Sequence, residues 1–495
     1  MTLYSRFSSR RQFLEDSMLA TAATLAATSA TTVSADQEPG KPVGPAEKLG
    51  VAVLGVHGQG QTHLACYVNN PATEILYICD PDQRIGEARA EAVGQKQGRR
   101  PKHVKDMRQA FDDPAVDIVS IATPNHWHCL AGIWAMLAGK DVYVEKPVSQ
   151  FVREGRSLVT AARKHKRICQ SGTQSRSSPA IRQAIEYLHS GKLGDVKLAR
   201  GLCYNQRDSI GPRGTFEVPP HIDYDLWCGP APDGPVTRRQ FHYDWHWQWD
   251  YGNGDIGNQG IHQMDIARWG LGVDRLSRAV ISCGYRYRWQ DAGETPNSLV
   301  TIHDYDSRTL VFEVRNLPTA PYRGAAVGVI FECSDGFLVN PSEDSATALD
   351  KQGNVITTFK GGDRHNHQRH TDNFIDAVRS RSAEMLNADV LDGHLSSALC
   401  HLSNISYRLG ELVSAEEMPQ RLEPLSAREN VRETLDRTAA HLRDNNVDPS
   451  NQKWQCGSWL KVDPDTESFI ENPRADKLLV RNDRGGFVVP PPEQI

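Results

Sequence analysis

The stretch FHYDWHWQWDYGNGDIGNQGIHQMD, which begins at residue 241, places three histidines and three tryptophans around a glycine-rich segment. Such residues could hold a metal ion, form a platform for a sugar, or fill a core. Trp245, Trp247 and Trp249 recur at every second position, which predicts a strand with the three rings on one face. On that strand His242 and His246 would stand about 13 Å apart, too far to share an ion. We therefore expect no metal site and interpret the tryptophans as core packing, with the alternative that one ring, that of Trp247, borders a substrate.

A glycine-rich turn follows the first apolar run of the folded chain, in LGVAVLGVHGQGQTHLACYV. The run VAVL predicts a buried parallel strand, and the glycines behind it open a helix. Gly55, Gly58 and Gly60 form G-x-x-G-x-G, a permuted relative of the dinucleotide fingerprint, with His57 and Gln59 between them. Glycine permits the tight turn and the close approach of backbone amides to a pyrophosphate. We expect these five residues to bind a dinucleotide.

An acidic residue ends the next predicted strand, EILYIC. Asp80 stands twenty residues after Gly60, where a carboxylate accepts hydrogen bonds from the adenosine ribose hydroxyls. Its charge would repel a 2′-phosphate, and Pro81 and Asp82 supply no cation for one. The sequence therefore favours NAD over NADP as the cofactor, with Arg84 as the nearby residue that keeps NADP as the less favoured alternative.

Helix and strand patterns alternate through residues 49–174. A helix is predicted from Gln83, followed by a strand at 117–123, a helix at 128–138 and a strand at 141–145, with a last strand near the sequence ICQ. This alternation predicts an α/β domain with a doubly wound parallel sheet of the Rossmann type.

Two polar motifs stand at the carboxyl ends of these strands, where such sheets bind ligands: ATPNHWH at 122–128 and EKP at 145–147. Together with the glycine turn they resemble the glucose–fructose oxidoreductase / inositol dehydrogenase (Gfo/Idh/MocA) superfamily, over essentially the whole chain from residue 50. The resemblance implies that the first motif lines the cofactor, that the glutamate of EKP contacts the nicotinamide end, and that the lysine is catalytic. The matching residues here are Thr123, Pro124, Asn125, His126, His128, Glu145 and Lys146.

The segment GNQGIHQMDIARWG predicts a helix that carries two further site residues. Sugar dehydrogenases of the superfamily have D-x-x-x-H here, facing the EKP lysine across the cofactor. In this chain the two positions are Asn258 and His262, so the histidine is retained and the acid is replaced by its amide. His262 could fill a helix interface, but the resemblance favours it as the base that removes a hydroxyl proton, with Lys146 as a relay. Asn258 can only orient a hydroxyl.

The second half of the chain reads as a different kind of domain. Residues 175–411 contain long alternating segments, which predict an α+β domain with an open, mostly antiparallel sheet. The resemblance implies that the outer face of this sheet serves oligomerisation, so a homo-oligomer is expected. We interpret His365, His367 and His370 as a polar loop and helix entry rather than a ligand set. Residues 412–495, charged and irregular in pattern, are expected to pack back onto the body.

The N-terminus predicts export. Within residues 1–35, Arg10 and Arg11 precede a Phe-Leu pair and a long run of small residues ending in VSA, which resembles a twin-arginine signal, although Glu15 stands where a lysine is common. A polar linker follows at 36–48. We expect passage through the twin-arginine translocase to the periplasm.

Composition excludes several classes of protein. The 495-residue chain has a net charge of −5 and 39% hydrophobic residues, with no basic block for nucleic acid and no apolar run that would span a membrane. Its ten cysteines are scattered, without a C-x-x-C pair. Because the twin-arginine route carries proteins that folded in the reducing cytoplasm, we predict few or no disulfides.

The function that these features predict is hydride transfer between bound NAD and a hydroxyl-bearing carbon of a sugar, sugar acid or cyclitol. The alternative is a redox-neutral glycosidase or epimerase that oxidises its substrate transiently. A ligand-holding protein without turnover is disfavoured because both Lys146 and His262 are present. Since free NAD is scarce outside the cytoplasm, we expect a tightly held cofactor and a closed redox cycle.

Overall fold

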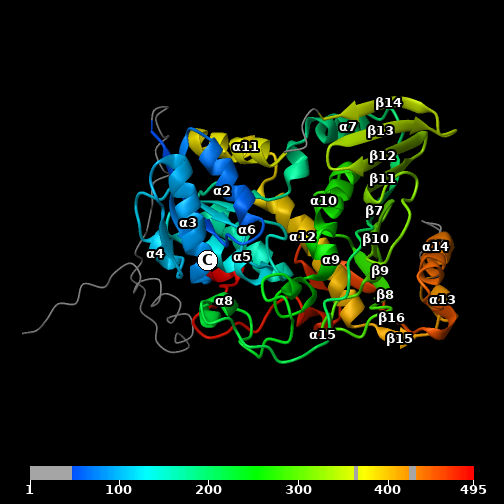
Figure 1. Cartoon of the computed structure of the whole chain (residues 1–495). Helices are drawn as coiled ribbons and strands as arrows, with labels where there is room; N and C mark the ends of the chain where they lie inside the picture. The colour runs from blue at the N-terminus through cyan, green and yellow to red at the C-terminus, as the bar shows by residue number, and fades with distance from the viewer. Residues whose placement is uncertain (1–46, 362–365, 423–430) are drawn as a thin grey trace, which may run out of the picture.

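The computed structural model describes residues 47–361, 366–422 and 431–495. The twin-arginine signal, nearly all of the linker and His365 lie outside these residues. Two sheets stand side by side with helices between them (Figure 1). In the described part of the chain, no helix combines the length and apolarity that a bilayer crossing requires.

The first sheet has six parallel strands in the order β3-β2-β1-β4-β5-β6. This order reverses between β1 and β4, which confirms the doubly wound Rossmann sheet and marks the place where such sheets bind ligands. Its central strand, β1, is buried along its whole length, as expected of a strand covered on both faces. The strands are β1 (Leu49–Leu54), β2 (Thr73–Cys79), β3 (Lys102–Val104), β4 (Ile118–Ile121), β5 (Asp141–Val144) and β6 (Cys169–Ser171).

Helices cover both faces of this sheet: α2 (Gly60–Asn69), α3 (Gln83–Gln97), α4 (Arg108–Phe111), α5 (Asn125–Leu137) and α6 (Val152–Lys164). A sixth helix, α11 (Asn366–Ser380), comes from the segment that the sequence assigns to the second domain. Its Phe374 and Ile375 pack in one cluster with Val51 and Val53 of β1. The apolar stripe of a helix does not reveal which sheet it covers, so its sequence alone could not place it.

The second sheet is open and mostly antiparallel, as predicted, with β7 and β10 as its parallel pair. Its order is β14-β13-β12-β11-β7-β10-β9-β8-β16-β15. The face toward the first domain is covered by α7 (Pro179–His189), α10 (Gly260–Leu271) and α12 (Val390–Arg408) (Figure 1). The strands are β7 (Val196–Cys203), β8 (Ala279–Tyr285), β9 (Ser298–Tyr305), β10 (Arg308–Arg315), β11 (Val327–Cys333), β12 (Gly336–Ser342), β13 (Ser345–Asp350), β14 (Val355–Lys360), β15 (Glu411–Val413) and β16 (Trp454–Cys456).

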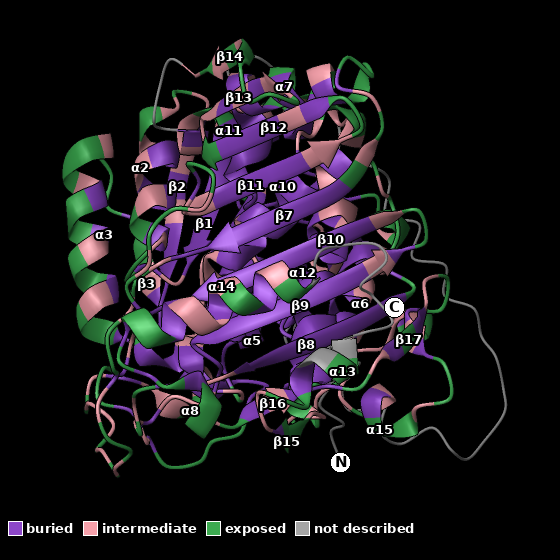
Figure 2. Ribbon diagram, turned by 90° about the vertical axis from the view of Figure 1, so that its right-hand side faces the viewer, coloured by how far each residue is buried: buried purple, intermediate pink, exposed green. Residues whose placement is uncertain are grey.

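The C-terminal region packs on the body, but it is more regular than its sequence pattern indicates. It adds β15 and β16 to the sheet and lays α13 (Met418–Leu422) and α14 (Val431–Asp444) on the outer face (Figure 2). Beneath α14, the fully buried carboxylate of Glu313 contacts Arg200 and Arg437, each at 2.8 Å. Part of the face expected to serve oligomerisation is therefore covered by the chain itself.

One disulfide joins the extension to the sheet, between Cys283 of β8 and Cys456 of β16. The other eight cysteines are free, and all but Cys333 are buried. This pattern lies within the prediction of few or no disulfides.

The strand predicted for the tryptophan-rich stretch does not form. Residues Asp244–Trp247 make a 3-10 turn, η2, in which the Asp244 carboxylate accepts a hydrogen bond from the Gln240 amide at 2.9 Å. A side chain that bonds to nearby backbone competes with a sheet ladder for those residues, which explains the difference. The argument against a metal site from the separation of His242 and His246 on a strand therefore does not apply. Among the described residues, no group of three or more His, Cys, Asp and Glu side chains is placed to hold a metal ion.

Candidate active site

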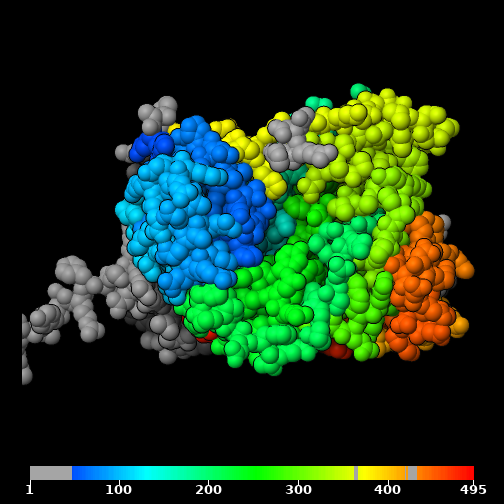
Figure 3. Space-filling view, viewed as in Figure 1, coloured from blue at the N-terminus to red at the C-terminus, as the bar shows by residue number. Residues whose placement is uncertain are grey.

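A cavity of about 310 Å³ lies at the carboxyl ends of β1, β2, β4 and β5. The molecular surface is hollowed between the first domain, in blue, and the second, in green and yellow (Figure 3). The second domain and the C-terminal extension supply part of the cavity wall. Its lining includes Gly55, His57, Gly58, Gln59, Asp80, Thr123, Pro124, Asn125, His128, Glu145, Lys146, Leu226, Trp227, His242, Tyr243, Trp245, His246, Asn258 and Phe487. The structure therefore gathers most of the residues predicted from sequence.

The glycine turn has the shape that a dinucleotide requires. Gly55 has a φ of +74°, and a Cβ there would stand 2.8 Å from the Ala122 carbonyl oxygen. A Cβ on Gly60 would meet the Gly55 carbonyl oxygen at 1.9 Å, whereas one on Gly58 would meet nothing within 4 Å. The turn is thus tightly packed against neighbouring backbone at Gly55 and Gly60 and open at Gly58, and α2 begins at its end. These residues fit a pyrophosphate held by backbone amides at a helix N-terminus.

Asp80 is buried beside this turn with its carboxylate fixed by two backbone amides. Oδ2 accepts a hydrogen bond from the Val56 amide and Oδ1 accepts one from the Asp82 amide, each at 2.9 Å. Each oxygen keeps a second lone pair for a ribose hydroxyl. Burial raises the pKa of Asp80 to about 6, so the carboxylate is ionised at neutral pH. Arg84 is exposed and does not line the cavity.

The ATPNHWH motif faces the cavity only in part. The hydroxyl oxygen of Thr123 is buried and has no hydrogen-bond partner among the described residues, so it is available to a ligand. Asn125 donates to the side-chain oxygen of Asn253 at 3.0 Å. His128 lies between the carbonyl oxygens of Thr123 and Pro147 and connects the two motifs.

His126 differs from what the resemblance implies. It is fully buried, its Nε2 lies 2.9 Å from the Trp227 carbonyl oxygen, and it does not line the cavity. It lies on the side of α5 that packs against the second domain.

Glu145 is the most heavily bonded residue of the site. Its Oε1 accepts hydrogen bonds from Gln59 at 3.2 Å and Gln174 at 2.8 Å, and it lies 3.1 Å from Nε2 of His63. Burial opposes ionisation, but the hydrogen bond and charge of His63 and the nearby Lys146 ammonium hold the pKa of Glu145 well below its usual range. The site therefore has a fixed negative charge at this end. His63 and Gln174 were not predicted as site residues from the sequence. The available signal for His63 was its position one helical turn after Gly60, on the helix that follows the glycine turn.

Lys146 reaches across the cavity to the second domain. Its Nζ donates to the backbone carbonyl oxygen of Asn258 at 3.1 Å, at the end of α9 (Gly254–Asn258). The predicted helix is thus two short helices, α9 and α10, joined at Gln259. Lys146 and the Asn258 amide consequently stand on the same part of the cavity wall.

His262 lies one turn beyond Asn258, on α10, and does not line the cavity. Its Nδ1 is buried without a hydrogen-bond partner among the described residues. Burial lowers the pKa of His262, the Glu343 carboxylate opposes that shift, and the Lys146 ammonium adds to it. The histidine is therefore neutral at pH 7 and lies within electrostatic range of Lys146.

The 3-10 turn η2 gives the cavity an aromatic wall. Tyr243, Trp245 and His246 line the cavity, whereas Trp247 is buried against Ile210 and Ala292. Of the three tryptophans in this stretch, the one that lines the cavity is therefore Trp245 rather than Trp247. The cause is the turn, which points the two rings in different directions, where a strand would have put them on one face.

Comparisons with known proteins agree with this geometry. A sequence model described as "Oxidoreductase family, NAD-binding Rossmann fold" matches residues 49–173, and its companion, "Oxidoreductase family, C-terminal alpha/beta domain", matches residues 211–437.

Three curated relatives show partial similarity. Levoglucosan dehydrogenase of Pseudarthrobacter phenanthrenivorans is 26% identical over 240 residues, which are 48% of this chain and 54% of that enzyme. The scyllo-inositol 2-dehydrogenase (NAD(+)) of Bacillus subtilis is 30% identical over 166 residues, 33% of this chain and 46% of that enzyme. Glycosyl hydrolase family 109 protein 2 of a Shewanella species is 33% identical over 253 residues, 46% of this chain and 54% of that protein. The chain thus spans about half the length of these relatives.

Solved structures share the fold. Levoglucosan dehydrogenase in complex with NADH and levoglucosan has a TM-score of 0.56 and 17% identity, covering 72% of this chain and 96% of that one. The WlbA dehydrogenase of Bordetella pertussis, in complex with NADH and UDP-GlcNAcA, has a TM-score of 0.53 and 17% identity, covering 72% and 95%. These likenesses show the fold. The two family models together match more than half of the chain, so the chain belongs to the Gfo/Idh/MocA oxidoreductase family, with an NAD-binding Rossmann domain at its N-terminal side.

Proposed function

We propose that this protein is an NAD-dependent oxidoreductase that transfers hydride between bound NAD and a hydroxyl-bearing carbon of a sugar, sugar acid or cyclitol. The observation that carries the proposal is the contact of Lys146 Nζ with the Asn258 carbonyl oxygen on the cavity wall, next to the ionised Glu145. This contact supports a role for Lys146 in proton transfer and for the Asn258 amide in binding, at the end of the cavity where we expect the nicotinamide. The relatives named for levoglucosan and scyllo-inositol support this class of substrate.

The residues divide the work of alcohol oxidation. NAD, when bound, supplies the carbon that accepts the hydride. Lys146 holds the substrate oxygen and carries its proton, and the Asn258 side chain orients a neighbouring hydroxyl. His262 is neutral at pH 7 and its pKa responds to the charge of Lys146, so it accepts one proton from the Lys146 ammonium, and the amine that this leaves takes the hydroxyl proton as the hydride departs. The negative charge of Glu145 offsets the positive charge of Lys146.

A redox-neutral glycosidase or epimerase is the second candidate. The 33% identity to a glycosyl hydrolase family 109 protein favours it, because that likeness extends over nearly half of the chain. In such a reaction the hydride returns to an intermediate of the same substrate, so no net NADH accumulates.

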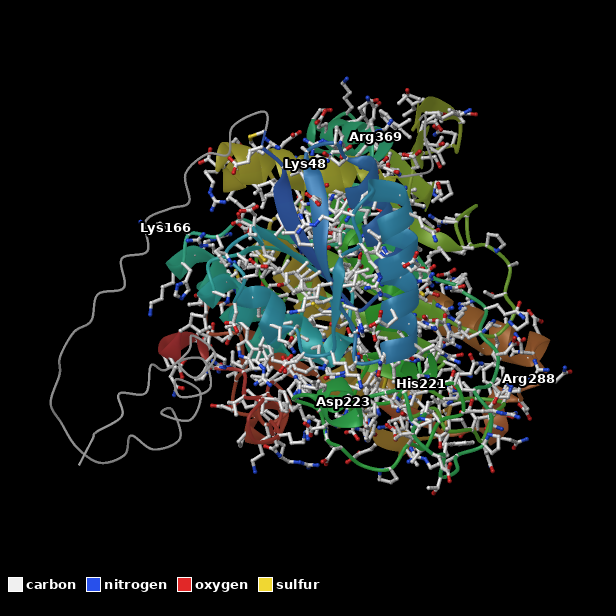
Figure 4. All side chains as sticks on the ribbon, turned by 60° about the vertical axis from the view of Figure 1, so that its left-hand side comes forward. Lys48, Lys166, His221, Asp223, Arg288 and Arg369 are labelled. Atoms are coloured by element: carbon white, nitrogen blue, oxygen red, sulfur yellow. A yellow bond between two sulfur atoms is a disulfide. The ribbon has the colours of Figure 1, made fainter. Side chains whose placement is uncertain are left out.

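Contacts between the two domains beside Asp80 support the proposal of slow cofactor release. His242 Nε2 lies 3.0 Å and His221 Nε2 3.4 Å from the buried carboxylate of Asp82, two residues after Asp80. The amide of Asp223 donates to the Pro81 carbonyl oxygen at 3.0 Å. His221 and Asp223 lie at the lower end of the first domain (Figure 4). We infer that this segment must open before the cofactor leaves, which suits a closed redox cycle.

Export and self-association complete the proposal. Arg10 and Arg11 support passage through the twin-arginine translocase to the periplasm, and fractionation of cells that express the full chain tests it. A homo-oligomer remains proposed from the family resemblance, although α14 covers part of the outer sheet face. Light scattering of the purified protein measures its mass directly.

The function is tested with purified protein and a substrate panel. Levoglucosan, myo-inositol, scyllo-inositol and 4-nitrophenyl glycosides are each added to NAD-loaded protein while the absorbance of reduced nicotinamide is followed. We expect reduction by a polyol or sugar in the wild type and a loss of about 10²- to 10⁴-fold in Lys146→Ala, with NAD content unchanged. Release of nitrophenol without net NADH would select the redox-neutral candidate. No reaction with any member would contradict both.

A further inference from the structure

His246 is a residue of the second domain that lines the cavity, and contacts with neighbouring rings restrict its side chain. It sits in the 3-10 turn η2, half-buried, with Lys146 and Asn258 lining the same cavity. Its ring stacks on that of Trp245, with centroids 3.7 Å apart and planes 21° from parallel. The ring of Tyr243 lies 5.0 Å away on another side. The imidazole therefore has little freedom to rotate.

One ring nitrogen of His246 is already committed. Nδ1 lies 2.5 Å from the backbone carbonyl oxygen of Tyr243. A carbonyl oxygen can only accept a hydrogen bond, so Nδ1 must carry the hydrogen. The neutral ring then has its lone pair on Nε2, and the hydrogen bond that this side chain makes to the described residues is the one at Nδ1.

The surroundings keep this ring neutral. Burial lowers the pKa of His246 to about 3, and the nearby cations Lys146 and Arg207 add to the effect. A group that binds protons so weakly is a poor general base at neutral pH but a good hydrogen-bond acceptor. In a cavity that the donors Lys146 and the Asn258 side-chain amide also line, it supplies an acceptor of fixed direction.

We propose that Nε2 of His246 accepts a hydrogen bond from a hydroxyl of the carbohydrate, and that this contact makes His246 a specificity-determining residue. The assignment rests on the proposed function and extends it, because it names the residue that selects a hydroxyl-bearing ligand. Trp245, stacked behind the imidazole, fixes the direction of the lone pair.

Two variants separate the acceptor from the ring. His246→Phe keeps a flat ring on Trp245 and removes both nitrogens, whereas His246→Gln restores a side-chain oxygen that can accept. The control is His189→Phe, an exposed histidine at the end of α7. The probe is whichever polyol of the panel (levoglucosan, myo-inositol or scyllo-inositol) reduces the bound NAD of the wild type. For each protein we measure its half-saturating concentration, the rate at saturation and the NAD content.

We expect His246→Phe to raise the half-saturating concentration at least about tenfold, the cost of an unmatched hydroxyl, with NAD content unchanged. His246→Gln should recover most of the loss, and the ratio between the variants should be constant from about pH 6 to pH 9, because His246 does not titrate there. Unchanged half-saturation in His246→Phe, with wild-type turnover intact, would overturn this assignment alone. Failure of the glutamine variant to recover would assign the effect to packing and also overturn it. A wild type that neither turns over nor binds any of the three polyols would overturn the proposed function and the assignment together.

Discussion

Acidification should weaken NAD binding through Asp80. Its carboxylate is the group that the cavity offers to the ribose hydroxyls, and a protonated carboxyl accepts hydrogen bonds less strongly. With a pKa of about 6, Asp80 is ionised in all but a small fraction of molecules near pH 7.5 and in about one tenth of them at pH 5. If NAD prefers the ionised form, its dissociation constant should rise about tenfold between these two values.

The sign of the effect on stability follows from the same shift. Because the folded pKa lies above the ordinary value of 3.8, the folded state binds the proton more tightly than the unfolded chain. The free energy of unfolding therefore falls by about 3 kcal/mol as pH rises from below 4 to above 6. Binding of NAD to the ionised carboxylate should restore part of the stability that is lost when Asp80 ionises. NAD should therefore raise the free energy of unfolding more at neutral pH than at acid pH.

The assay is calorimetric titration of charcoal-stripped protein with NAD⁺ at several pH values. His57 and His242 also line the cavity, and their pKa values are lowered by burial, so their protonation in acid would add positive charge and oppose the expected change. The variant Asp80→Asn keeps both histidines and serves as the control, with an affinity that should not fall on acidification. Wild-type affinity that stays constant or increases from pH 7.5 to pH 5 would refute the role of Asp80.

Two further predictions concern contacts between the C-terminal region and the rest of the chain. Phe487 lines the cavity, and its ring packs edge-on against that of Trp127 with centroids 5.5 Å apart. Phe487→Ala should therefore weaken NAD binding several-fold in the same titration while the protein stays folded. An affinity equal to that of the wild type would mean that Phe487 does not contribute to NAD binding. Glu313→Gln should lower the free energy of unfolding by about 3–5 kcal/mol because it leaves the buried Arg200 without its carboxylate and leaves Arg437 with Glu433 alone. A melting temperature within one or two degrees of the wild type would contradict it.

The sequence predicted the parts of the site that local rules determine. A tight turn that admits no Cβ requires glycine, so Gly55 and Gly60 could be recognised from spacing alone. Asp80 and Lys146 follow strands whose apolar runs are easily read, and parallel strands bring their carboxyl ends to one edge. The Rossmann sheet and the mostly antiparallel second sheet could be predicted for the same reason.

What could not be predicted depends on contacts between distant residues. Glu145 gains Gln174 and His63 from other elements, and no period in the sequence links them. The strand prediction for the tryptophans was wrong because alternation specifies a strand only where a neighbouring strand pairs with it, and Asp244 bonds to nearby backbone instead. His246 reaches the cavity wall because of that turn, so its place in the site could not be predicted from the sequence either.

Isotope transfer tests the central claim most directly. NAD-loaded protein is incubated with a substrate of the panel that carries deuterium on its hydroxyl-bearing carbons, and the cofactor is then released and analysed by mass spectrometry. Hydride transfer at the Lys146 end of the cavity predicts deuterium on the nicotinamide ring in the wild type and almost none in Lys146→Ala of equal NAD content. Product formation without deuterium in the cofactor, or equal labelling in both proteins, would contradict the proposed mechanism.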